Sequence, residues 1–204
     1  MTIAVLRPEL DRPRSFTQDT LGWVPWLEPP AEAELTDAQR AGLVQASRAA
    51  SPYFRLLAED PRVLEARTRA DFDIFHSTRD GLPRAERELA AAVASRVNGC
   101  VFCTSVHARF ASHHSGREAD IQRLLAEGPD ALTDDGSDPR WSAITEAAVA
   151  LTVTPVELGP EHLAALRSAG LDDLAIVDVI GATAFFAWAN RLMLSLGEPE
   201  VVGT

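Results

Sequence analysis

The sequence predicts an all-α fold with an extended N-terminal arm. Helix-starting signals recur after residue 35, mostly a proline in a first turn or a capping box such as Thr36–Gln39. Glycines follow several of the predicted helices, at positions where a left-handed residue commonly ends a helix. Few segments show the alternation of apolar and polar residues that is typical of strands. We therefore expect a helical bundle.

Residues 1–35 differ in composition from the rest of the chain. Five prolines leave this segment little room for a helix, and Trp23 and Trp26 are its aromatic anchors. Two interpretations are open, because the arm could pack on its own domain or cover a neighbouring subunit or the mouth of a site. The predicted organisation is an extended arm over 1–35 followed by one all-helical domain over 36–204.

Capping residues, prolines and glycines set the expected helix boundaries. Gly81 is the expected stop of the third helix and Asn98-Gly99 of the fourth, while the polar stretch 130–138 is expected to be a surface loop. The helices are predicted over residues 36–50, 52–59, 61–79, 84–97, 100–114, 118–127, 139–153, 160–169 and 172–196.

A weak internal repeat links two of these helices. Pro83-Arg84 recurs as Pro139-Arg140, and the alanine-rich run 91–94 recurs at 147–150 with the same offset. Alanine-rich helices also match by chance, so a two-fold repeat and coincidence both stay open. In a true repeat, only the first copy would contain thiols.

The charge and hydropathy patterns exclude several classes of function. Of 204 residues, 46% are apolar and 24% charged, as in a globular protein, and the net charge is -11. Such acidity disfavours nucleic acid and anionic membrane surfaces, which attract basic proteins. The most apolar segment, 174–196, is interrupted by Asp178, Asn190 and Arg191, so no membrane span of ~20 residues is expected.

Cysteine usage indicates a reducing compartment. Two cysteines are too few for a secreted disulfide scaffold, and the first residues lack the apolar core of a secretory signal. We expect a cytoplasmic protein without a cofactor.

The two cysteines form the most informative motif in the chain. Cys100 and Cys103 are three residues apart, and His107 follows one helical turn later. On a helix these three side chains fall within roughly a 60° sector, and the two Cα atoms would lie about 5–5.5 Å apart, close enough for a disulfide. Gly99 suggests that Cys100 occupies the first turn, where backbone N–H groups stabilise a thiolate. His107 could take the proton of Cys103.

Glu88 is the candidate carboxylate on the preceding helix. It shares a face with small residues suited to close packing, so it could orient His107 or relay protons. The alternative is a surface ion pair with Arg84. Glu86 lies about 200° away around the helix and is expected to be solvated.

Two other classes of function compete with redox chemistry. Cys100, Cys103 and His107 could be three ligands of a zinc ion, but His114 would lie about 10 Å further along the helix and no second ligand cluster exists. We therefore expect no metal. The bundle could also be an oligomeric binding module with an unused cysteine pair.

The spacing of Glu88, Cys100, Cys103 and His107 resembles the alkylhydroperoxidase AhpD / carboxymuconolactone decarboxylase family, in particular its peroxidase-related members. The resemblance covers residues 82–128. It implies an AhpD-like helical fold and a homo-oligomer, commonly a trimer or hexamer. It also implies a thiol peroxidase or disulfide oxidoreductase that acts on small hydroperoxides.

The same resemblance implies roles for the four residues. Cys103 would attack the peroxide and become a sulfenic acid, Cys100 would condense with it to a disulfide, and Glu88 and His107 would relay protons. An external dithiol, such as a lipoylated protein, would then reduce the disulfide. AhpD proteins often have a second histidine between the cysteines, where this chain has Phe102. The decarboxylase branch does not rely on two such cysteines, so their presence favours thiol chemistry.

Overall fold

The computed structural model describes residues 6, 9–77 and 80–202. Its described part is dominated by α-helices, as predicted, with one two-stranded sheet. The helices are α1 Asp37–Gly42, α2 Pro52–Leu57, α3 Pro61–His76, α4 Arg84–Val97, α5 Val101–Ser115, α6 Glu118–Glu127, α7 Pro139–Thr152, α8 Pro160–Ser168 and α9 Asp173–Leu196. Three short 3-10 helices are Glu32–Glu34, Ala46–Ala50 and Pro129–Leu132, and the strands are β1 Leu21–Pro25 and β2 Gly197–Val201.

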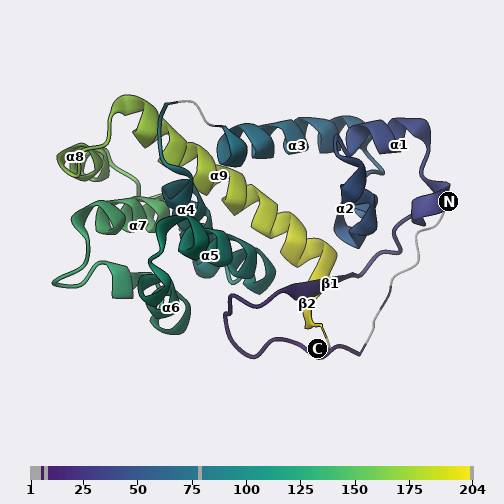
Figure 1. The fold of residues 1–204 in the computed structure, drawn as a ribbon, viewed down its shortest axis with the longest axis horizontal. Helices are drawn as coiled ribbons and strands as arrows, with labels where there is room; N and C mark the ends of the chain where they lie inside the picture. The colour runs from purple at the N-terminus through teal and green to yellow at the C-terminus, as the bar shows by residue number, and fades with distance from the viewer. Residues whose placement is uncertain (1–5, 7–8, 78–79, 203–204) are drawn as a thin grey trace.

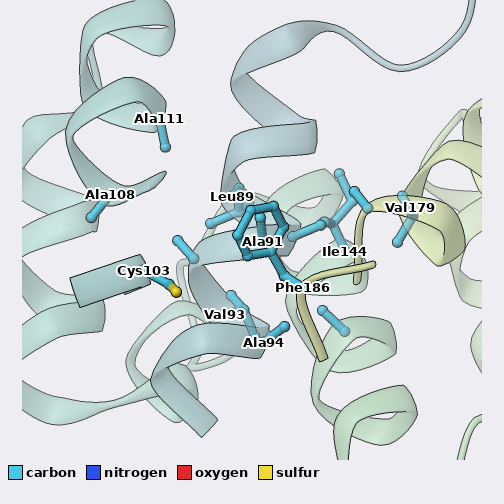
Figure 2. Packing of buried hydrophobic residues seen from close by; sticks show 14 of the residues in the cluster. Leu89, Ala91, Val93, Ala94, Cys103, Ala108, Ala111, Ile144, Val179 and Phe186 are labelled. Carbon is cyan, nitrogen blue, oxygen red and sulfur yellow. The ribbon is translucent and has the colours of Figure 1, made fainter. Parts of the chain in front are cut away.

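The centre of the bundle is α4, which packs against α5, α7 and α9. Ten consecutive residues of α4, 86–95, are buried, because neighbouring helices cover the helix on all sides. Figure 1 shows α9 crossing the molecule diagonally, with α7 and α8 near one of its ends and α1 and α2 beyond the other. Small side chains on α4 let the surrounding helices approach closely, and Figure 2 shows Ala91, Val93 and Ala94 within the resulting core.

The arm packs on its own chain through a two-stranded antiparallel ribbon. β1 pairs with β2, so that Leu21 lies opposite Val201 and Pro25 opposite Gly197. Trp23 is buried in the core and meets the ring of Tyr53 edge-to-face at 5.3 Å. β2 could not be predicted from the sequence, because its five residues directly follow a long helix and show no clear alternation of apolar and polar residues.

The helix predicted over 36–50 is wrong in its second half. The capping box at Thr36 and Gln39 is present, but α1 ends at Gly42, and a separate 3-10 helix follows. A Cβ atom on Gly42 would lie 2.6 Å from the carbonyl oxygen of Pro61, so this glycine permits a close approach to the start of α3. Val44 has a positive φ of 63°, which turns the chain away from a helical path.

Most other boundaries agree with the sequence to within one or two residues. α3 ends at His76, earlier than predicted, because Ser77 is already in an extended conformation, and the last predicted helical residues, 78–79, lie outside the described part of the chain. The loop predicted over 130–138 contains the short helix Pro129–Leu132. α4 and α7, the two helices that share the repeated motif, pack against each other.

By length and apolar composition, α9 is long enough to cross a membrane, alone among the described helices. It packs against α3, α4, α7 and α8 and contributes buried residues such as Val179, Phe186 and Asn190 to the interior. The helices of protein cores often have this composition, so α9 is weak evidence for a membrane span.

Candidate active site

The two thiols lie at the start of α5, directly after the turn that ends α4. Gly99 makes this turn with a φ of 75°, a left-handed conformation that glycine adopts without steric cost. Cys100 is the N-cap of α5, and Cys103 lies in its first turn. Both are free and buried, and their sulfur atoms lie 2.9 Å apart. Figure 2 shows Cys103 among the buried side chains of the core.

The proximity of the two sulfurs makes their ionisation asymmetric. A hydrogen bond with the Cys103 thiol lowers the pKa of Cys100, and the Cys103 backbone amide and the Asn190 side chain act in the same direction. Burial raises the pKa of Cys103 well above its ordinary value, and the neighbouring Cys100 raises it further. The first proton lost by the pair therefore leaves a thiolate on Cys100 that accepts a hydrogen bond from Cys103.

Glu88 and His107 meet where α4 packs on α5. His107 Nδ1 lies 2.6 Å from Oε2 of Glu88, and Arg84 donates to the other carboxylate oxygen at 3.1 Å. Glu88 is only 1% exposed, so the alternative of a surface ion pair with Arg84 is wrong: the contact with Arg84 is present, but the carboxylate is buried and also binds His107. Because the carboxylate holds the proton on Nδ1, Nε2 is the nitrogen that is left to take or give a proton.

Aromatic rings hold the imidazole of His107 in place. The ring of Phe186 on α9 meets it edge-to-face at a centroid distance of 3.8 Å, and Phe75 on α3 lies 5.2 Å away. Two further helices, α9 and α3, therefore fix the orientation of this side chain, in addition to Glu88 on α4.

Glu86 is not solvated, contrary to the expectation from the sequence. It is only 7% exposed, and its two carboxylate oxygens accept hydrogen bonds from Arg140 on α7 at 2.7 and 2.8 Å. The helical wheel correctly places Glu86 away from Glu88, but α7 covers that face. The two carboxylates therefore serve different partners on opposite sides of α4.

Asn190 is a site residue that the sequence did not single out. Its amide is fully buried, donates to Ser95 at 3.0 Å and accepts from Asn98 at 3.0 Å. Hydrogen bonding from Asn190 also lowers the pKa of both thiols. The sequence does contain a signal for Asn190: it is a polar amide inside a long apolar helix, and buried polar groups need hydrogen-bond partners.

Two cavities reach the cysteine pair from different sides. A larger one of about 350 Å³ is lined by Cys103, His107 and Glu88, together with aromatic and aliphatic side chains. A smaller one of about 270 Å³ is lined by Cys100 and by the ribbon residues Trp23 and Gly197. Phe102 and Met193 line both cavities, so they separate the two spaces.

A charged cluster of three residues forms another wall of the larger cavity. Arg48 and Arg67 both bind Oδ2 of Asp71, at 2.9 and 3.1 Å. Burial alone would raise the pKa of Asp71, but the two guanidinium groups outweigh it, and the pKa falls below its ordinary value. Two positive charges that share one carboxylate leave this wall with a net positive charge.

Within the described residues, no group of three or more His, Cys, Asp and Glu side chains is arranged to hold a metal ion. Glu88 faces the histidine, and Cys100 and Cys103 face each other. The four residues thus form two adjacent pairs, a dithiol and a carboxylate–imidazole pair, which suit proton and thiol chemistry.

Comparison with protein families identifies the segment that contains both pairs. Residues 61–148, from the start of α3 into α7, match the Carboxymuconolactone decarboxylase family. This segment belongs to the carboxymuconolactone decarboxylase family. The family predicted from the cysteine motif is thus confirmed, and the matched segment contains all four predicted site residues. No curated protein matches the chain.

Solved structures show that the chain has an AhpD-like fold over most of its length. The alkylhydroperoxidase AhpD core described as a peroxidase-related protein from Ralstonia eutropha JMP134 is 22% identical, with a TM-score of 0.69 over 85% of this chain and 90% of that one. A peroxidase-related protein from Silicibacter sp. TM1040 is also 22% identical, with a TM-score of 0.69 over 93% and 96%.

A further similar structure has a different recorded reaction. The debrominase Bmp8 is 16% identical to this chain, with a TM-score of 0.64 over 88% of this chain and 91% of that one, and a variant of Bmp8 is in complex with 2,3,4-tribromopyrrole. Proteins with similar backbones therefore have names that refer to different reactions, so the chemistry of this chain has to be argued from its site residues.

Proposed function

We propose that the protein is a thiol peroxidase that reduces organic hydroperoxides with Cys103 and Cys100. The observation that carries this proposal is the 2.9 Å separation of the two sulfurs beside the Glu88–His107 pair. A similar fold in peroxidase-related proteins supports it. The simplest reaction that uses the two thiols, the carboxylate and the imidazole is two-electron oxidation of one thiol followed by disulfide formation.

Cys103 is the proposed attacking residue because it lines the larger cavity together with His107. Its thiolate attacks the outer peroxide oxygen, the O–O bond breaks, and Cys103 becomes a sulfenic acid while the alkoxide leaves. The proton that the thiol pair loses first goes to Nε2 of His107, Glu88 stabilises the charged imidazole, and His107 then gives this proton to the alkoxide. The organic product is an alcohol.

The ground-state ionisation opposes this assignment, because Cys100 is the thiol with the lowered pKa. At 2.9 Å, however, Cys103 can pass its proton to the Cys100 thiolate as it attacks the peroxide. Access supports the same order, because Cys103 lines the larger cavity and Cys100 lines the smaller one. Cys100 is then a thiol next to the sulfenic acid.

The second half of the cycle releases one water molecule and oxidises an external reductant. The Cys100 sulfur attacks the Cys103 sulfenic acid, a disulfide forms, and one water molecule leaves. An external dithiol, for which a lipoylated protein is the proposed source, then exchanges with the disulfide and is itself oxidised. We place this cycle in the reducing cytoplasm and expect a homo-oligomer, a trimer or hexamer, as the working form.

Thiol counting during turnover tests the proposal. Reduced protein is treated with a small excess of cumene hydroperoxide, and free thiols are titrated in the wild type, in Cys100→Ser and in Cys103→Ser. We expect loss of both thiols in the wild type, a trappable sulfenic acid in Cys100→Ser and an unreactive thiol in Cys103→Ser. Survival of both wild-type thiols would exclude peroxidase activity and favour a binding module, while metal bound in proportion to the protein would favour the zinc alternative.

A further inference from the structure

Two residues that line the larger cavity each have a buried hydrogen-bond donor without a partner among the described residues. The donors are the hydroxyl of Tyr53, on α2, and Nε of Arg67, on α3. Both residues line the cavity beside Cys103, and they are only 6% and 9% exposed. A buried donor without an acceptor is destabilising, so an acceptor that enters the cavity and reaches both donors would remove this cost.

Tyr53 offers a neutral hydroxyl at physiological pH. Burial is the main reason that the pKa of Tyr53 is raised, so its O–H stays protonated. The charges of Arg67 and of both cysteines also affect this group, which places it in the same electrostatic environment as the thiol pair. The hydroxyl can therefore donate to an anionic ligand.

Arg67 is held rigidly with one edge of its guanidinium group free. Nη1 binds Asp71, and the group lies over the rings of Phe54 and Phe185 at 5.4 and 5.3 Å. Its Nε has no partner in the described structure. The planar fork of an arginine matches the two oxygens of a carboxylate, which a lysine does not.

The charge balance of the cavity also favours an anion. Three arginines line it, Arg48, Arg67 and Arg84, against the two carboxylates of Asp71 and Glu88. Counted without the two lining histidines, His76 and His107, the cavity has a net charge of +1 in a protein whose net charge is -11. Its remaining walls are largely apolar and include Phe75, Phe102, Val106, Phe110, Phe186 and Met193.

We propose that the larger cavity binds hydroperoxides with an apolar body and a carboxylate, and that Tyr53 Oη and Arg67 Nε donate to that carboxylate. This substrate class rests on the proposed peroxidase function, but binding of the carboxylate itself does not require any reaction. The volume of about 350 Å³ is at the small end for ligand pockets, which suits a compact aromatic or short aliphatic acid.

Binding of unreactive analogues tests the site independently of turnover. Para-isopropylbenzoate and its neutral amide are titrated against the wild type and against Tyr53→Phe, which removes only the hydroxyl. We expect the benzoate to bind the wild type more tightly than the amide, and Tyr53→Phe to weaken benzoate binding about tenfold with little effect on the amide. Arg67→Lys, which keeps the charge and loses Nε, should weaken benzoate binding to a similar extent.

Thr145→Val is the matched control. The Thr145 hydroxyl is also buried without a partner among the described residues, but it lies on α7 and lines neither cavity. We expect its removal to leave benzoate binding unchanged. Equal binding of benzoate and amide to the wild type, or unchanged benzoate binding in Tyr53→Phe, would overturn the proposal.

Turnover separates failure of this site from failure of the peroxidase function. Cumene hydroperoxide and its para-carboxylate have the same reacting group, and Tyr53→Phe should lower kcat/KM about tenfold for the carboxylate alone. Carboxylate-dependent binding without reduction of either peroxide would overturn only the peroxidase function. Equal loss of activity on both peroxides would overturn the carboxylate site and leave the peroxidase function in place.

Discussion

The sulfurs of Cys100 and Cys103 lie 2.9 Å apart, yet the two residues line different cavities. Cys103 shares the larger, mostly apolar cavity with His107, whereas Cys100 lines a smaller cavity next to the β1–β2 ribbon. This arrangement suits a reaction in which the oxidising substrate approaches the reduced cysteine pair from one side and the reducing dithiol approaches the disulfide from the other. Phe102 and Met193, which line both spaces, keep the two sides apart.

Replacing Glu88 with glutamine should lower kcat/KM for hydroperoxides by about 100-fold, because the neutral amide no longer stabilises a charged His107. The matched control is Glu86→Gln, two residues away on the opposite face, where the partner is Arg140. That variant should lose stability and keep its rate constant. Steady-state kinetics and thermal unfolding of both variants check this, and equal rate losses would contradict the assignment.

Removing the Cys103 thiol should raise the pKa of Cys100 toward the ordinary thiol value of about 8.5, because its main stabilising hydrogen bond is lost. The thiolate absorbance of Cys103→Ala in the ultraviolet, followed against pH, measures this. In the converse variant, Cys100→Ala, burial should still hold the pKa of Cys103 above that value. A Cys100 that titrates in Cys103→Ala as it does in the wild type would contradict the coupling.

The Asp71→Asn variant should lose about 2 kcal/mol of unfolding free energy near neutral pH, because Arg48 and Arg67 lose their shared carboxylate. The pKa of Asp71 is lower in the folded protein than in the unfolded chain. Its stabilising contribution is therefore complete above about pH 3.9 and is lost as the pH falls through the folded value.

Urea unfolding of the wild type and Asp71→Asn at several pH values checks this dependence. Glu65→Gln is the control, since Glu65 pairs with Arg69 on the exposed side of the same helix, and its loss should cost less than about 1 kcal/mol. A stability difference for Asp71→Asn that stays constant down to pH 2 would show that its charge is not involved.

The Phe102→His variant should raise peroxidase activity about tenfold, because it adds a proton donor to the wall shared by the two cavities. Phe102→Leu, which removes the ring and adds no proton donor, serves as the control for altered packing. Measurement of kcat/KM against pH separates the two effects. If histidine and leucine change the rate alike, the ring position has no role in proton transfer.

The sequence alone determines the local parts of this protein. Capping residues, prolines and glycines act within a few residues, so the start of α1, the turn at Gly99 and the end of α5 could be predicted from it. The spacing of Cys100, Cys103 and His107 likewise places three side chains on one helix face before any contact is known. The same periodicity places Glu88 on a face of small residues in the preceding helix, and the resemblance to a known family implied its role in proton transfer.

Only the tertiary structure decides which faces are covered and what meets across helices. The burial of Glu86 by Arg140, the early end of α1 at Gly42 and the pairing of β1 with β2 depend on segments far apart in the chain. The same holds for Asn190 beside the thiols and for Tyr53 and Arg67 in the larger cavity. Packing brings these groups together and excludes water from them. Contacts between segments that are far apart in the chain cannot be predicted from the periodicity of the sequence.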